Sequence, residues 1–201
     1  MKNFLSFCCI LIYNNSIKNG KSIKNNIIFV AGIYGVGKDY LVSKVSSKFD
    51  IIKYSASDII SQTIGEKYGS NKYVTDKNAN QEALVEFFES YDNDKLVLLT
   101  GHFCILDKNN DVVKLPEYTY NKLRIKHIIC FNAEIGIIQN HLINRDGKIY
   151  DLDVLDKLQK EELNFSYDIA KNNNIKYTIF DNYFKEEDVL RFENIIIGDI
   201  S

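Results

Sequence analysis

The sequence predicts a three-layer α/β domain, in which helices flank a parallel sheet of five strands. Short apolar, β-branched runs alternate along the chain with stretches of helical periodicity, and strands separated by helices pair in parallel with right-handed crossovers. A glycine-rich loop joins the first apolar run to the first helical stretch. The 201 residues are enough for one such domain, and we divide them into an N-terminal extension, 1–25, and the domain, 26–201.

The first strand and the loop after it are the stretch around which the rest of the chain is organised. Residues 27–31 are apolar, and residues 32–38 (GIYGVGK) match the spacing G-x-x-x-x-G-K before a helix that begins near Tyr40. Glycines let successive backbone N–H groups converge on an anion, and the helix adds the positive end of its dipole. The predicted phosphate cradle consists of Gly32, Ile33, Tyr34, Gly35, Val36, Gly37, Lys38, Asp39 and Tyr40.

Asp39 departs from the usual motif, in which Ser or Thr after the lysine places a hydroxyl on Mg²⁺. A carboxylate at this position repels phosphates unless a cation lies between them. We therefore expect Asp39 to be a Mg²⁺ ligand, directly or through water. The alternative for the whole motif, a glycine-rich turn with a surface lysine, is disfavoured by the three glycines and the flanking strand and helix.

The remaining elements follow in alternation. We expect strands at 50–54, 96–100, 126–131 and 175–180, helices at 40–49, 59–62, 82–91, 134–144, 151–171 and 186–192, a polar turn or small hairpin at 107–111, and a mobile segment or short helix at 63–80. The helix at 151–171 carries Glu162 near the same face as its leucines.

Polar residues near the ends of these strands are candidates for binding a second substrate. Ser57 and Asp58 follow the second strand, where they either cap the next helix or border the phosphate loop. Asn80 and Gln81 open a helical stretch and are candidates for hydrogen bonding to an acceptor, with a solvent-facing position as the alternative for Gln81. His102 follows the third strand, either donating to a substrate or serving as a hydrogen-bonded structural residue.

Composition limits the partners and the compartment. The net charge is −2, so no basic excess indicates a nucleic-acid partner. The four cysteines form no C-x-x-C pair, which excludes a zinc site and fits a reducing cytoplasm. An apolar run at 4–13 resembles part of a signal peptide, but it is too short to span a bilayer and no cleavage site follows. We expect a docked extension or an upstream start codon and no stable membrane insertion, with a membrane anchor as the alternative.

The chain resembles P-loop nucleoside monophosphate kinases, and among them archaeal-type adenylate kinases and bacterial adenylate-kinase-like ATP-binding proteins. The resemblance covers residues 27–182 and rests on four stretches: 32–38, 54–58 (YSASD), 101–116 (GHFCILDKNNDVVKLP) and 145–151 (RDGKIYD). It implies the three-layer P-loop NTPase fold, ATP and Mg²⁺ as cofactors, and γ-phosphoryl transfer to a small-molecule acceptor such as a nucleotide. It also implies a homo-oligomer.

The resemblance assigns roles to further residues. Lys38 and Arg145 would be the catalytic cations, with Arg145 closing over the transferring group; an exposed ion pair with Asp146 is the alternative. Asn182 would contact the donor base. Thr100 stands where the family usually has an aspartate, and Arg145 is alone in the lid. These departures leave two alternatives open: an ATP-binding switch or weak ATPase that acts through a protein partner, and a kinase of a different metabolite.

Overall fold

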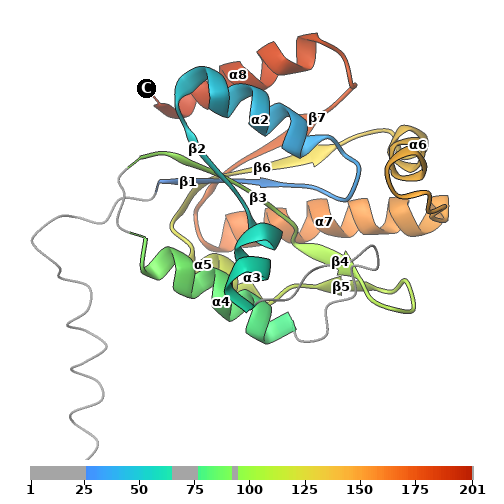
Figure 1. Cartoon of the computed structure of the whole chain (residues 1–201), viewed down its shortest axis with the longest axis horizontal. Helices are drawn as coiled ribbons and strands as arrows, with labels where there is room; N and C mark the ends of the chain where they lie inside the picture. The colour runs from blue at the N-terminus through green and yellow to red at the C-terminus, as the bar shows by residue number, and fades with distance from the viewer. Residues whose placement is uncertain (1–25, 65–76, 92–94, 201) are drawn as a thin grey trace, which may run out of the picture.

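The computed structural model describes residues 26–64, 77–91 and 95–200, and Figure 1 labels their elements. In chain order they are β1 (Ile27–Ala31), α2 (Lys38–Phe49), β2 (Ile52–Ser55), α3 (Ala56–Ile64), α4 (Lys77–Glu89), β3 (Val97–Gly101), β4 (Cys104–Leu106), β5 (Val112–Lys114), α5 (Glu117–Lys122), β6 (Ile125–Asn132), α6 (Ile135–Asp146), α7 (Leu152–Asn172), β7 (Lys176–Asp181) and α8 (Glu187–Ile200). The N-terminal extension and most of the segment at 63–80 lie outside the described residues, so the expectations for them stay predictions.

Five strands form one sheet in the order β2-β3-β1-β6-β7, and every neighbouring pair is parallel. This confirms the predicted parallel sheet. Because β1 is the central strand, the loop that follows it leaves the middle of the sheet at the carboxyl ends of the strands. In open α/β sheets, ligands bind at this edge, where the strand order reverses.

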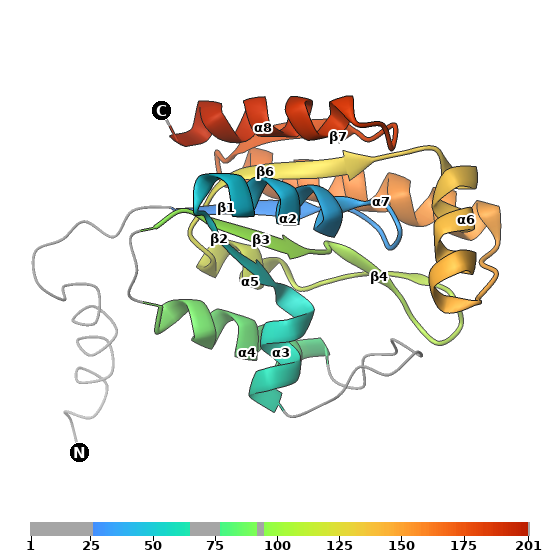
Figure 2. The ribbon, with the colours of Figure 1, turned by 45° about the horizontal axis from the view of Figure 1, so that its top comes forward.

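The central strands β1 and β3 are buried on both faces, as strands of a parallel sheet between helices must be. Alternate residues of β1 point to opposite sides: Ile28 and Val30 pack in the cluster that includes α2 and α8, whereas Phe29 packs with α4, α5 and the later part of α7. Figure 2 shows α2 in front of the sheet and α7 behind it. The three predicted layers are therefore confirmed.

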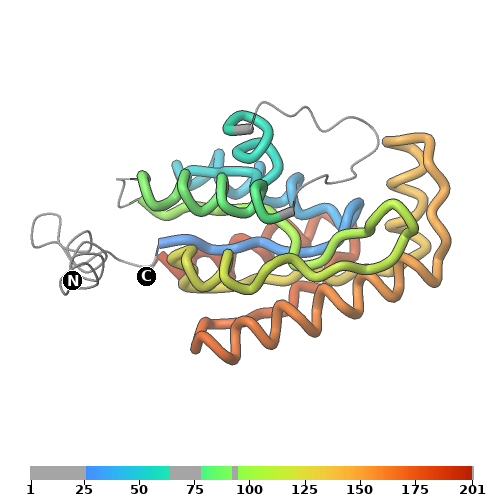
Figure 3. The backbone as a smooth tube through the Cα atoms, turned by 90° about the horizontal axis from the view of Figure 1, so that it is seen from below, coloured from blue at the N-terminus to red at the C-terminus, as the bar shows by residue number. Residues whose placement is uncertain are grey.

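The chain ends of the domain and the loop after β1 lie at opposite ends of the molecule. The start of β1 and the end of α8 lie together at one end, and the loop after β1 lies beside α6 at the other (Figure 3). The small hairpin expected at 107–111 is confirmed by the antiparallel pair β4–β5. None of the helices within the described residues has both the length and the apolarity that a bilayer crossing requires.

Several boundaries differ from the prediction. Helix α3 begins at Ala56, so Ser57 and Asp58 lie in its first turn and the expected capping role is wrong. Helix α4 begins at Lys77, before the apolar periodicity starts. Helix α5 was not predicted, since its six residues are too few for a periodic pattern. Helix α8 continues to Ile200, beyond the predicted end at residue 192.

Candidate functional site

The loop between β1 and α2 has the backbone that an anion cradle requires. Gly35 and Gly37 have φ angles of 76° and 88°, in the left-handed region that glycine adopts without strain. A Cβ on Gly37 would lie 2.5 Å from Nδ2 of Asn182, so no other residue fits there without movement. Gly37 is also the N-cap of α2, and no side chain at this position accepts a hydrogen bond from the first turn. The first N–H groups of α2 therefore have no side-chain cap and are oriented for an anion.

Lys38 lies against the inside of this loop. Its Nζ donates to the carbonyl oxygen of Gly32 at 3.0 Å and lies 3.4 Å from that of Ile33, and the residue is only 6% exposed. The backbone carbonyl groups of the loop thus hold the ammonium group of Lys38 in place. Lys38 also contributes to the wall of the neighbouring cavity.

A cavity of about 890 Å³ opens from the loop along the carboxyl ends of β2 and β3. Its volume falls within the range of small-molecule sites. Its polar lining residues are Lys38, Asp39, Ser55, Ser57, Asp58, Ser61, Asn80, Gln81, Thr100, His102 and Arg145. Its apolar and aromatic lining comes from Phe29, Tyr34, Tyr40, Ile60, Leu84, Ile105, Leu115 and Tyr120. One space thus joins an anion cradle to a second wall of neutral and acidic side chains.

Comparison with family models matches residues 31–159 to the family described as AAA domain, which is well over half of the chain. The chain belongs to this AAA domain family. It is a P-loop NTPase family that includes kinases. Membership of this family indicates that the loop after β1 binds a nucleotide. A search of curated proteins found no match to the chain.

The five residues predicted to bind the acceptor come together in the AAA domain. Ser57, Asp58, Asn80, Gln81 and His102 all line the same cavity as Lys38. Gln81 is 6% exposed, so its alternative position on a solvent-facing surface is wrong. The ring of His102 also packs on that of Tyr34, with ring centroids 4.8 Å apart.

Asn80 has a further property that points to a ligand. It is 3% exposed, and its Nδ2 is buried without a hydrogen-bond partner within the described residues. A buried donor without a partner costs about 1–3 kcal/mol. Because Asn80 lines the cavity, a bound molecule with an acceptor oxygen or ring nitrogen would remove that cost.

Arg145 makes the ion pair with Asp146 that was its alternative role, and its catalytic role stays a prediction. It lines the cavity, and its Nε and Nη2 donate to the Asp146 carboxylate at 2.7 and 2.5 Å. This hydrogen bonding is the main reason that the pKa of Arg145 is raised, with a smaller contribution from the charge of Asp39. The guanidinium is therefore a half-exposed cation that lines the cavity and is already paired.

Asp39 is compatible with a magnesium ion that is also held by phosphates. It lies exposed in the first turn of α2 and lines the cavity. Residues 26–64, 77–91 and 95–200 contain no group of three or more His, Cys, Asp or Glu arranged for a metal. Protein sites for Mg²⁺ often supply only one or two carboxylates beside the substrate phosphates, so this donor set fits. The assignment of Asp39 remains a prediction.

Some residues of the predicted cradle do not line the cavity. Ile33 and Val36 are fully buried core residues, and Gly32 does not line the cavity. Asn182, predicted to contact the donor base, is 4% exposed and does not line the cavity either. Its Nδ2 instead donates to the carbonyl of Val36 at 2.8 Å. Asn182 therefore supports the loop from the end of β7.

The role of Glu162 was not predicted from the sequence. This residue of α7 is fully buried, and its carboxylate accepts the backbone N–H groups of Gly32, Phe103 and Cys104. The signal in the sequence was a carboxylate on the apolar face of a long helix, where an unpaired charge is costly. That signal indicates a buried partner, but it does not say which backbone groups are bound.

Proposed function

We propose that this protein is an ATP-dependent phosphotransferase of the nucleoside monophosphate kinase type. It transfers the γ-phosphoryl group of Mg-ATP to a small molecule, such as a nucleotide, bound in the same cavity. The observation that carries the proposal is that one cavity is lined by Lys38 and the cradle glycines at one end and by Asp58, Asn80 and Gln81 at the other. A protein that only bound or hydrolysed a nucleotide would not need the second polar wall.

The residues divide the work by charge. Backbone N–H groups of the loop and Lys38 bind the donor phosphates, because converging amides and an ammonium group match their negative oxygens. Asp39 shares a magnesium ion with those phosphates. Arg145 faces the same space and stabilises negative charge on the group in transfer. Phosphoryl transfer needs mainly positioning and charge stabilisation, which these groups supply.

A second function has its own support. Thr100 lines the cavity where the resemblance leads one to expect an aspartate, and Arg145 is held by Asp146. Both features fit an ATP-binding switch or weak ATPase that acts through a protein partner. Such a protein would hydrolyse ATP without any small-molecule acceptor.

Calorimetry with Mg-ATP and a coupled assay for ADP formation test the proposal. Lys38→Ala should abolish measurable Mg-ATP binding, whereas Lys44→Ala, at an exposed position of the same helix, should bind like the parent protein. A panel of nucleoside monophosphates and other hydroxyl compounds should then include one that stimulates ADP formation. Hydrolysis that no acceptor stimulates, with Mg-ATP binding intact, would favour the switch; absence of Mg-ATP binding would reject both.

A further inference from the structure

A single buried carboxylate connects the phosphate loop to the segment that follows β3. Oε1 of Glu162 accepts hydrogen bonds from the backbone N–H of Gly32 at 3.1 Å and of Phe103 at 3.0 Å. Oε2 accepts from Phe103 at 2.9 Å and from Cys104 at 2.5 Å. Phe103 directly follows His102, which lines the cavity. Glu162 therefore fixes the position of the phosphate loop relative to the segment that carries His102.

The same carboxylate is coupled to Lys38 through the backbone of one residue, Gly32. The N–H of Gly32 donates to Glu162, and the carbonyl of Gly32 accepts from Nζ of Lys38 at 3.0 Å. A displacement of Gly32 changes both contacts. The charge of Lys38 also acts on the carboxylate directly, since it lowers the pKa of Glu162.

The charge on Glu162 is costly. Burial has the largest effect on the pKa of Glu162. It raises that pKa to about 7, although the backbone donors and Lys38 lower it. A neutral side chain can dock the same helix: Gln159, one turn earlier in α7, bonds both the N–H and the carbonyl of Ala133 with its amide. The contrast indicates that the carboxylate does more than attach α7 to the sheet.

We infer that Glu162 is a proton-responsive positioning residue, whose carboxylate holds Gly32 and Phe103 in the arrangement that binds the nucleotide and whose protonation releases them. A protonated carboxyl group keeps one good acceptor oxygen, and its hydroxyl faces an N–H group that needs an acceptor. Protonation therefore removes part of this connection. The identity of the nucleotide rests on the proposed function, whereas the response of the loop to pH does not.

The titratable side chains that act on Glu162 within the described residues keep their charge state near neutral pH. They come from every element packed around it: Tyr34 of the loop, Lys38 of α2, Cys104 of β4, Tyr120 of α5, Cys130 of β6 and Tyr177 of β7. Burial raises the pKa of the tyrosines and cysteines in this set well above their ordinary values, so they stay neutral. His102 also lines the cavity, and it is present in both proteins when the parent is compared with a Glu162 variant.

Binding of Mg-ATP by calorimetry at several pH values tests the inference. Between about pH 8 and about pH 6, the affinity of the parent protein should fall about tenfold more than that of Glu162→Gln, because hydrogen bonds to a charged group are lost only in the parent. Titration of the ATP phosphates and of the other side chains is common to both proteins and cancels. Gln159→Leu, which weakens α7 docking but keeps Glu162, should retain the pH response of the parent. Parallel profiles for the parent and Glu162→Gln would overturn the inference.

A measurement on the parent protein covers the case in which Glu162→Gln does not fold. In NMR spectra without nucleotide, the amide signals of Gly32, Phe103 and Cys104 should shift together, with one midpoint near the Glu162 pKa of about 7. Three amides that do not titrate between about pH 5.5 and about pH 8.5 would overturn the inference, whatever the variants show. Absence of Mg-ATP binding at every pH would reject the proposed function and leave this amide titration as a separate test.

Discussion

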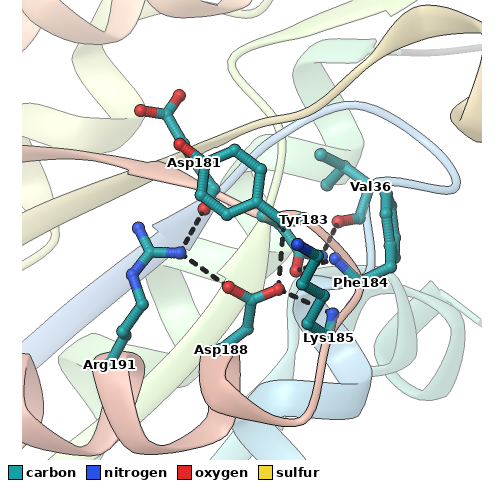
Figure 4. A network of polar contacts seen from close by, with 8 residues as sticks. Val36, Asp181, Tyr183, Phe184, Lys185, Asp188 and Arg191 are labelled. Carbon is teal, nitrogen blue, oxygen red and sulfur yellow. Dashed lines mark hydrogen bonds and ion pairs between the residues drawn. The ribbon is translucent and has the colours of Figure 1, made fainter.

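The side chain of Asn182 attaches the phosphate loop to the end of β7, with Nδ2 donating to the carbonyl oxygen of Val36 at 2.8 Å. Its Oδ1 accepts from the N–H of Phe184 at 3.2 Å, and its own N–H donates to the carbonyl of Asn132 at 2.8 Å. Figure 4 shows Val36 and Phe184 beside the network around Asp188, whose carboxylate binds the backbone of the same segment. A loop rich in glycine is thereby held in one conformation from a distant part of the chain.

Removing this contact should loosen the loop. Asn182→Ala deletes the donor to Val36 and leaves a buried carbonyl without it, which costs about 1–3 kcal/mol of stability. Affinity for Mg-ATP should fall by about tenfold, because the nucleotide must then order the loop itself. Calorimetry and urea unfolding measure the two effects.

The matched control is Asn132→Ala, at the end of the neighbouring strand. The amide of Asn132 donates to Asp181 at 2.8 Å and does not contact the loop. We expect this variant to keep the Mg-ATP affinity of the parent protein. Equal losses of affinity in the two variants would show that Asn182 acts only through general stability.

Gly37 provides a second test of the loop. Gly37→Ala places a Cβ at a φ of 88° and 2.5 Å from Nδ2 of Asn182, so the new methyl group displaces the side chain that holds Val36. The backbone strain alone costs about 1–2 kcal/mol. Mg-ATP binding by calorimetry should be at least about tenfold weaker. Gly198→Ala in α8, where a Cβ meets nothing within 4 Å, should bind normally and be slightly more stable. Normal binding by Gly37→Ala would contradict the cradle geometry.

The order of strands and helices could be predicted because each is encoded locally. The apolar run of β1 and the leucines of α7 have the periods of a buried strand and an amphipathic helix. Helix α5 has only six residues, so no period is visible. Helix α8 was cut short at residue 192 because Ile195, Ile196 and Ile197 follow one another and do not resemble a helical stripe.

The candidate site could be predicted to the extent that it follows from strand ends. Residues after β2 and β3 had to lie beside the phosphate loop in a parallel sheet, and Asp58 and His102 do so. Glu162 and Asn182 could not be assigned in this way, because their partners are separated from them by 130 and 146 residues. Such contacts depend on how α7 and β7 pack, which no local pattern specifies.

Substitution of Asn80 should affect acceptor binding and stability in different directions. Asn80→Leu removes a buried Nδ2 that has no partner within the described residues, so the free energy of unfolding should stay the same or rise by up to about 3 kcal/mol. Turnover that depends on the acceptor should fall about tenfold or more, because the acceptor loses a hydrogen bond in a closed site. Thermal unfolding and the coupled ADP assay measure the two quantities.

The control for this variant is Asn78→Leu, at an exposed position of the same helix. It should leave acceptor-dependent turnover close to that of the parent protein. A loss of stability in Asn80→Leu with unchanged turnover would show that Asn80 is a structural residue and does not contact the acceptor.

A buried histidine makes the far end of the sheet sensitive to pH. Nδ1 of His127 lies 2.5 Å from Oδ2 of Asp199, near the end of α8, and Nε2 lies 2.9 Å from Oγ1 of Thr178. Burial is the main reason that the pKa of His127 is lowered, and the contact with Asp199 opposes it only in part. The folded protein therefore holds this imidazole neutral at pH values at which the unfolded chain begins to protonate it.

The sign of the effect follows from proton uptake. Below the ordinary histidine pKa of 6.5, the unfolded chain binds the proton more readily than the folded chain, so the stability that His127 contributes is lost as pH falls. In urea unfolding between about pH 7.5 and about pH 5, the parent protein should lose stability relative to His127→Gln. The contribution of Glu162 is the same in both proteins and cancels. His141→Gln, at an exposed histidine of α6, should follow the parent across this range. A constant difference between the parent and His127→Gln would show that His127 does not titrate on unfolding.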